Sequence, residues 1–403
     1  METFAGIDWA SEEHALCVVD ESGEKLAGEF FAHEEAGIRE LIARMRALGV
    51  VRVAIERPDG LLVDRLLEGG FAVLPVHPNK LKATRSRYEV AGGKSDGFDA
   101  FCLAELARTD AHRLRVLRPD SDETRALRSL TRTREDLVAA RVRLANELRA
   151  QLEAFWPGAA RIFADVDSPI GLAFLERYPA PADARGLGEK RLAGFLARHR
   201  YCGRRSAAQL LERLRTAPEG RAGALEVEAR RAAVLGLVAA LGPIVAQIAE
   251  LTSQVAHAVR AHPDGAIFLP LFRDPKSVIT AARLVAEIGD DRARYPTVEA
   301  LAADAGVCAV ARESGKRKVA GFRWACDKRL RDAVCTLANS TRHHHPWARG
   351  FYLAARARGL DHPHAIRVLG RAWLRVLWRC WQDGVPYDPS KHGNLRRLRL
   401  EGG

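Results

Sequence analysis

Hydrophobic positions in the first 78 residues alternate between two spacings. Apolar, β-branched runs bounded by turn residues predict strands, whereas apolar residues spaced three and four apart predict helices. At residues 35–49, Ile38, Leu41, Ile42 and Met45 fall on one helical face. The order is strand, hairpin, helix, strand, helix, strand, which is typical of an α/β domain. These elements are expected at residues 4–10, 14–33, 35–49, 50–56, 61–70 and 71–78.

A basic segment follows this α/β pattern. Residues 79–98 contain several lysines and arginines and a Gly-Gly pair without a clear apolar period, so we expect an irregular connection there. Helical spacing returns at residues 98–109.

Two long helices are predicted in the middle of the chain. One covers residues 122–155 and the other residues 225–259, and in both the large apolar residues recur with the heptad spacing of a coiled coil. Pro243 should kink the second helix or mark a restart. The 157–222 segment between them is rich in Pro, Gly, Ala and Arg and predicts short helices with loops. The two long helices could pair with each other or with another subunit.

The last third of the chain reads as mostly helical. A Gly- and Lys-rich loop is expected at residues 311–322, between two predicted helices before it and three after it. The fold class is therefore an α/β N-terminal domain, a helical coiled-coil middle and a mostly α-helical C-terminal domain. We place these regions at residues 1–120, 121–261 and 262–403.

The charge balance points to a polyanionic partner. Lys and Arg total 63 against 51 for Asp and Glu, which gives a formal net charge of +12. Such an excess favours nucleic acid or an anionic membrane surface. Residues 232–249 carry no charge and approach the length of a membrane-spanning helix, but Gly236, Gly242 and Pro243 interrupt them. We interpret this stretch as a buried or coiled-coil helix and expect no membrane partner.

The cysteines and the N-terminus indicate the compartment. The 7 cysteines are scattered and form no CxxC pair, so the sequence indicates neither a zinc ribbon nor a disulfide framework. The first residues lack a basic region followed by an apolar one, as a signal peptide would have. We expect a cytoplasmic, nucleoid-associated protein.

Four carboxylates of the N-terminal region could form a metal site. Asp8 lies within the first strand, Glu56 at the tip of a later strand, and Asp96 and Asp99 three residues apart at a helix start, which favours one helical face. Hard divalent cations prefer oxygen ligands, and two ions about 4 Å apart can hold the attacking and leaving oxygens of a phosphodiester. This pattern predicts a Mg²⁺ site in which Mn²⁺ could substitute.

Each of these acids also has an ordinary structural explanation. Asp8 could be a turn residue at a strand end, Glu56 an ion-pair partner of Arg57 or Lys94, and Asp96 the N-cap of the following helix. Because all four fall at positions that could converge, we favour the metal site.

Ser314 is a candidate nucleophile. It precedes a glycine, and cations nearby would attract a DNA phosphate and stabilise the charge that develops during phosphoryl transfer. A serine in a basic loop can equally be an ordinary turn residue. The cations expected to contact nucleic acid around it are Arg312, Lys316, Arg317 and Lys318.

A second basic strip leads into the acidic pair. Phosphate contact and an ordinary solvated loop both explain such a strip. Its predicted nucleic-acid-binding residues are Lys80, Lys82, Arg85, Arg87 and Lys94.

Four segments resemble one family of recombinases. GIDWA at 6–10, AIERPDG at 54–60, HPNKLKATR at 77–85 and KSDGFDA at 94–100 follow the order found in the DEDD transposases of insertion-sequence family 110. The N-terminal domain of that family resembles the RuvC Holliday-junction resolvase. The resemblance implies an RNase H-like fold in which Asp8, Glu56, Asp96 and Asp99 bind the metal.

The C-terminal third resembles the transposase domain of the same family. Residues 281–318 and 330–359 carry this likeness, which implies that Ser314 is the recombination nucleophile, in a composite site with the N-terminal acids that subunits could share. It also implies a structured bridge RNA that pairs with target and donor DNA. The chain departs from the family at LFRDPKS, where a Gly-rich hairpin is usual, and at WACDKRLR after the serine loop.

These observations lead to one main hypothesis. The chain is interpreted as a DNA transposase that exchanges strands through a phosphoserine–DNA intermediate with Mg²⁺ assistance, as a homodimer or homotetramer guided by RNA. A metal-dependent junction nuclease that uses water, or a non-catalytic nucleic-acid-binding derivative, would also explain the basic charge.

Overall fold

The computed structural model describes residues 2–88, 95–272, 278–314 and 317–389. The chain divides into two compact units, residues 1–120 and residues 121–403. The sequence placed a domain boundary at the same point, and its second boundary, between residues 261 and 262, falls inside the second unit.

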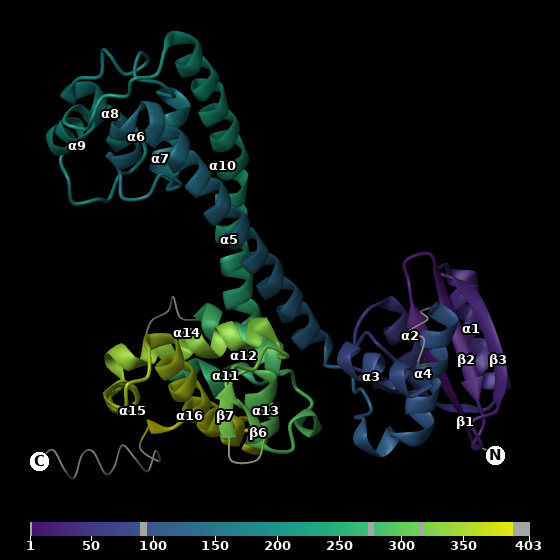
Figure 1. Ribbon diagram of the computed structural model, residues 1–403. Coiled ribbons are helices and arrows are strands. Elements are labelled where there is room, and N and C mark those ends of the chain that lie inside the picture. The colour runs from purple at the N-terminus through teal and green to yellow at the C-terminus, as the bar shows by residue number, and fades with distance from the viewer. Residues whose placement is uncertain (1, 89–94, 273–277, 315–316, 390–403) are drawn as a thin grey trace, which may run out of the picture. The chain divides into compact units, whose positions relative to one another are not determined.

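The N-terminal unit is a five-stranded sheet covered by helices on both faces (Figure 1). The strand order is β3-β2-β1-β4-β5, with β1, β2 and β3 antiparallel and β4 and β5 parallel to β1. The sequence-based order of strands and helices through residue 78 is confirmed. The strands are β1 (Thr3–Trp9), β2 (Glu13–Val19), β3 (Lys25–Ala32), β4 (Val50–Ile55) and β5 (Ala72–Pro75).

Alternating side chains divide the sheet between two cores. Ile7, Val53 and Val73 face the helices α1 and α2, whereas Phe4, Ala54 and Leu74 face α4. Burying both faces of the central strands explains why they read as nearly continuous apolar runs. The helices of this unit are α1 (Glu35–Ala47), α2 (Leu61–Glu68), α3 (Pro78–Tyr88), α4 (Asp96–Thr109) and the short η1 (Ala111–Arg113).

The irregular connection predicted at residues 79–98 is wrong in its first half. Residues 78–88 form α3, which runs beside α4. Leu81 is the one buried apolar side chain that α3 contributes, so no helical stripe marks it in the sequence. Contacts of Tyr88 also hold the helix: its ring meets Phe101 of α4 edge-on at 5.3 Å, and its hydroxyl donates a 2.7 Å hydrogen bond to Glu105.

A histidine pair lies at one end of the sheet. His14 is buried opposite Trp9, and its Nε2 lies 2.8 Å from Nδ1 of His33. Burial, and then the neighbouring His33, lower the pKa of His14 to about 4.

Acidification should therefore destabilise the N-terminal unit through His14. Its folded pKa lies below the unfolded value of about 6.5, so the unfolded chain binds the extra proton and stability falls as the pH drops through this window. Between pH 7.5 and 5 we expect a loss of about 2 kcal/mol that His14→Gln does not show. Urea unfolding of the full chain at both pH values, with limited proteolysis to detect unfolding of this unit, measures the change in its free energy of unfolding. An equal pH dependence in the variant would contradict the assignment.

Two long helices pair in the second unit. α5 (Asp122–Phe155) and α10 (Ala224–Ala261) confirm the predicted long helices. They pack against each other side by side, as Figure 1 shows. The segment between them forms short helices, as predicted, and these helices share one apolar core with α5 and α10. Its helices are α6 (Pro157–Arg161), α7 (Pro169–Arg177), α8 (Glu189–Arg198) and α9 (Ala207–Arg215).

Pro243 lies inside an unbroken α10, so of the two outcomes expected at this proline, a kink or a restart, the restart is excluded. A proline leaves the carbonyl four residues earlier without its helical partner. That residue, Ala239, is exposed, as is Pro243, so water can satisfy the carbonyl. Of the helices that the structure describes, α10 alone is long and apolar enough to cross a membrane by length and composition, and here it packs against α5.

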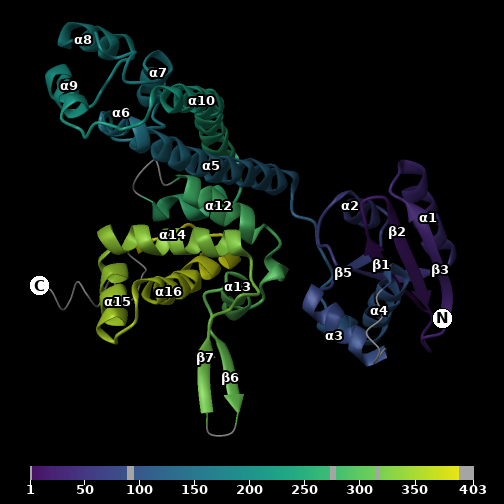
Figure 2. The ribbon, with the colours of Figure 1, turned by 45° about the horizontal axis from the view of Figure 1, so that its top comes forward.

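The remaining elements form a helical body with a projecting hairpin (Figure 2). Its core contains the fully buried Trp373 and Trp381 together with Leu127 of α5. The helices are α11 (Gly265–Phe268), η2 (Leu269–Leu271), α12 (Val278–Ile288), η4 (Arg292–Arg294), α13 (Val298–Asp304), α14 (Lys328–His344), α15 (Pro346–Ala357) and α16 (His362–Asp383).

The predicted loop at residues 311–322 is wrong in its secondary structure. Residues Val310–Ser314 form β6 and residues Arg317–Gly321 form β7, paired as an antiparallel hairpin. Few apolar residues alternate here, and the hairpin extends away from the helical body (Figure 2). The sequence therefore lacked the pattern that identifies a half-buried strand.

Candidate active site

Asp8 and Glu56 lie side by side at one edge of the sheet. β1 and β4 are parallel neighbours with Ile7 opposite Ile55, so the next residue of each chain segment reaches the same carboxyl edge. Neighbouring strands are about 4.8 Å apart. By the alternation that turns Phe4 and Ala54 toward α4, both carboxylates belong to the face that α4 covers, and both are half-buried.

Asp99 joins this face from α4. It lies in the first turn of the helix and is 1% exposed. Arg85 of α3 binds both of its carboxylate oxygens, with Nε donating to Oδ1 and Nη2 donating to Oδ2. The hydrogen bond to Asp99 raises the pKa of Arg85, and the nearby charge of Glu56 contributes.

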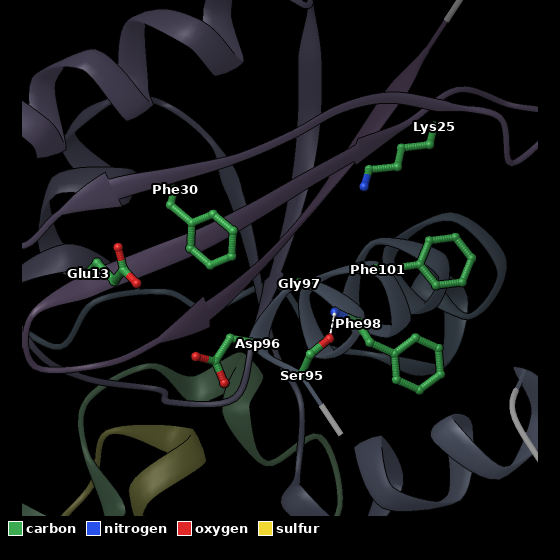
Figure 3. A pocket seen from close by; sticks show the side chains of 8 residues that line it. All are labelled: Glu13, Lys25, Phe30, Ser95, Asp96, Gly97, Phe98 and Phe101. Carbon is green, nitrogen blue, oxygen red and sulfur yellow. Dashed lines mark hydrogen bonds between the residues drawn. The ribbon is translucent and has the colours of Figure 1, made fainter. Parts of the chain in front are cut away.

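Asp96 has different surroundings from Asp99. It is exposed at the start of α4, where Ser95 is the N-cap and accepts a hydrogen bond from the Phe98 amide. Figure 3 shows Asp96 at the rim of an open pocket of about 870 Å³ between α4 and the outer strands. Three phenylalanines, Glu13 and Lys25 also line this pocket.

The donor set suits a hard cation, but Arg85 engages one member of it. Among the residues that the structure describes, no group of three or more His, Cys, Asp or Glu side chains is arranged to hold a metal ion. The guanidinium of Arg85 donates hydrogen bonds to both carboxylate oxygens of Asp99 and supplies the positive charge that a buried carboxylate requires. While Arg85 is bound in this way, the carboxylate oxygens of Asp99 are not available to a metal ion.

Some cations of the basic strip on α3 form ion pairs, and others are exposed to solvent. Lys80 lies 3.6 Å from Asp110, and Arg85 is bound to Asp99. Lys82 and Arg87 are exposed, and Lys94 lies outside the described residues. Lys82 and Arg87 are thus the members of the strip presented to solvent.

Ser314 is the last residue of β6. It is exposed and paired in register with Arg317 of β7, which places it beside the two-residue connection of the hairpin. Arg312 pairs with Val319 and Lys318 with Glu313, whereas Lys316 lies outside the described residues. The hydroxyl is therefore carried at the far end of a hairpin whose sequence is strongly basic.

A group of arginines that the sequence motifs did not reveal lies at the foot of this hairpin. Arg323 follows β7, and Arg367, Arg371 and Arg375 recur every four residues on α16. These side chains line one pocket with the ends of the hairpin. The four-residue spacing was the available signal, because like charges at i and i+4 destabilise a helix by themselves.

Comparison with known proteins identifies the family from both ends of the chain. Residues 5–157 match the DEDD model of IS110 type, described as a transposase, and residues 277–353 match the model described as the IS116/IS110/IS902 transposase family. The Streptomyces coelicolor protein named "Mini-circle putative transposase for IS117" is 31% identical over 97% of this chain and 96% of its own length. The chain belongs to the IS110/IS116/IS902 family of transposases.

Two further relatives cover the transposase from end to end. The IS900 "uncharacterized 42 kDa protein" of Mycobacterium paratuberculosis is 30% identical over 96% of the transposase and 97% of its own length. The IS116 "uncharacterized 44.8 kDa protein" of Streptomyces clavuligerus is 30% identical over 96% of both chains. The resemblance found in the sequence motifs is confirmed, and DNA transposition is the general activity, with DNA as the partner.

Proposed function

We propose that the transposase exchanges DNA strands through a covalent bond between Ser314 and a DNA phosphate. The observation that carries this proposal is the exposed Ser314 hydroxyl at the end of the basic β6–β7 hairpin. The serine oxygen attacks a phosphodiester and loses its proton, one phosphorus–oxygen bond of the DNA breaks, and the departing DNA oxygen takes up a proton. A free DNA hydroxyl then attacks the phosphoserine and releases the serine.

The N-terminal acids complete the chemistry in this proposal. The strand order β3-β2-β1-β4-β5, with one antiparallel edge and one parallel edge, supports an RNase H-like fold. Asp8, Glu56 and Asp99 would hold Mg²⁺, with Mn²⁺ as a substitute and Asp96 as the outermost ligand. The ion, when bound, would stabilise charge on the phosphate oxygens. The carboxylates would position the ion, and Arg85 would neutralise the charge of Asp99 until the ion binds.

Three partners belong to the same proposal. A structured bridge RNA selects target and donor DNA, and a homodimer or homotetramer brings the acids and the serine together as a composite site. The positive net charge of +12 supports binding of both nucleic acids. The transposase would act in the cytoplasm, on nucleoid DNA.

A denaturing-gel assay for a protein–DNA adduct tests the proposal. With element-end DNA, Mg²⁺ and copurified RNA, the native transposase should form an adduct that Ser314→Ala and Asp8→Asn both abolish. Ser253→Ala, at an exposed serine of α10, serves as the control and should retain it.

Two other outcomes would reject this mechanism. Cleavage without an adduct that survives Ser314→Ala and fails in Asp8→Asn would identify a metal-dependent nuclease that uses water. Salt-sensitive binding that leaves every substrate intact would identify a non-catalytic derivative.

A further inference from the structure

A pocket of about 420 Å³ opens at the foot of the β6–β7 hairpin. Ala309 precedes β6, Gly321 ends β7, and both line it together with Phe351 of α15. The opposite wall is α16. The pocket thus lies at the base of the hairpin whose far end carries Ser314.

The pocket wall is strongly basic. Arg323, Arg367, Arg371 and Arg375 line it with His364, and no Asp or Glu does so among the described residues. Nε of Arg323 is buried and has no hydrogen-bond partner within the described part of the chain. A buried guanidinium nitrogen without a partner is costly, so the arrangement favours an anionic or hydrogen-bond-accepting occupant.

The arginines of α16 are not explained by ion pairs. In the described residues, Arg371 and Arg375 contact no carboxylate, whereas Arg379, one turn further, lies 2.6 Å from Asp383. Three arginines at four-residue spacing repel one another unless a ligand neutralises them. A phosphodiester does so with two acceptor oxygens, which suit the planar donors of arginine.

An exposed aromatic side chain lies beside the pocket. Trp324 is 77% exposed and meets the ring of Phe322 edge-on at 4.8 Å. Phe322 itself lies against the guanidinium groups of Arg331 and Arg367, 4.8 and 4.9 Å from its centroid. The two cation–π contacts hold the ring of Phe322, and Trp324 packs against that ring. An exposed indole beside a phosphate site is the arrangement on which an unpaired base stacks.

We propose that this pocket binds an unpaired stretch of the DNA strand that Ser314 attacks, with one phosphodiester on Arg323, Arg371 and Arg375 and a neighbouring base on Trp324. The strand identity rests on the proposed function, because Ser314 and the pocket share the hairpin. β6 spans about 13 Å from Val310 to Ser314 at the usual rise of a strand. This length equals about four stacked nucleotides, so the bound phosphate lies about four nucleotides from the phosphate under attack.

Binding measurements test the pocket independently of the chemistry. The probe is a fluorescent single-stranded oligonucleotide of the element end, titrated against full-length transposase in the Ser314→Ala background at several salt concentrations. Arg371→Gln and Arg375→Gln should each weaken binding about tenfold and lower the salt slope by about 0.7. Trp324→Ala should weaken binding about tenfold and leave the slope unchanged.

Arg379→Gln is the matched control. It removes the same charge from the next turn of α16, where Arg379 is ion-paired and exposed, and should change affinity less than twofold. If Arg371→Gln and Arg375→Gln behave like Arg379→Gln, the pocket is not a DNA site. If they weaken binding of copurified RNA and leave the DNA oligonucleotide unaffected, RNA is the occupant and the proposal is wrong.

A neutral-phosphate scan locates the contact. Methylphosphonate substituted at each position in turn should weaken binding at one phosphate of the strand, and Arg371→Gln should lose that sensitivity. If methylphosphonate weakens binding at none of the positions, the proposal is wrong. Because these experiments measure binding, they test the pocket whether or not Ser314 forms an adduct with DNA.

Discussion

Gly6→Ala is expected to destabilise the N-terminal unit by about 3 kcal/mol and to abolish transposition. A Cβ atom at Gly6 would fall well inside van der Waals contact of the Ala100 carbonyl oxygen and the Ala104 amide nitrogen. Both are backbone atoms of α4, so no side-chain rotation relieves the clash. The helix must move away from β1, and with it Asp99 moves away from Asp8. Stability and the candidate active site should therefore fail together.

Gly97→Ala provides the matched control for this prediction. Gly97 lies in the first turn of α4, and the nearest atom to an added Cβ there is Cζ of Phe30 at 4.0 Å. This alanine should leave the unfolding midpoint unchanged or raise it slightly, because it lowers the conformational entropy of the unfolded chain. Urea unfolding and adduct formation are measured on all three proteins. A Gly6→Ala protein as stable as Gly97→Ala would disprove the close packing of β1 and α4.

Most of the fold follows from periodicity, and its exceptions have physical causes. The strands that bury both faces and the helices with a continuous apolar stripe, such as α1 and α5, were predicted within a few residues. α3 escaped prediction because Leu81 is its one buried apolar side chain, and Tyr88 at its end combines a ring contact with Phe101 and a hydrogen bond to Glu105. The β6–β7 hairpin escaped because it extends away from the core.

The site was only partly accessible from sequence. A strand tip identifies Glu56 as a residue at a sheet edge, and parallel pairing of β1 with β4 brings Asp8 beside it. Pairwise contacts between separate helices leave no comparable pattern, so nothing in the sequence indicated that the guanidinium of Arg85 binds Asp99. The arginine pocket needed the structure as well, because Arg323 is 44 residues before Arg367, the first arginine of the group on α16.

Arg85→Ala should destabilise the metal-free transposase by about 3 kcal/mol. The Asp99 side chain is 2% exposed and that of Arg85 26% exposed, so removing the arginine leaves a buried carboxylate without its cation. The cost of such a group arises from lost solvation, which a surface ion pair hardly involves. If Asp99 is a metal ligand, the same substitution frees its oxygens. Mg²⁺ should then stabilise Arg85→Ala more than the native protein, because an ion that binds the folded state raises its stability.

Lys82→Ala separates this effect from a general loss of positive charge on α3. Lys82 is exposed on the same helix, and its removal should change the unfolding midpoint little, with or without Mg²⁺. Unfolding of the three proteins in EDTA and in millimolar Mg²⁺ gives the comparison. Arg85→Ala should lie well below the other two in EDTA and recover part of the difference in Mg²⁺. Equal Mg²⁺ effects in all three would mean that Arg85 and a metal ion do not compete for Asp99, and that the Arg85–Asp99 pair has a structural role alone.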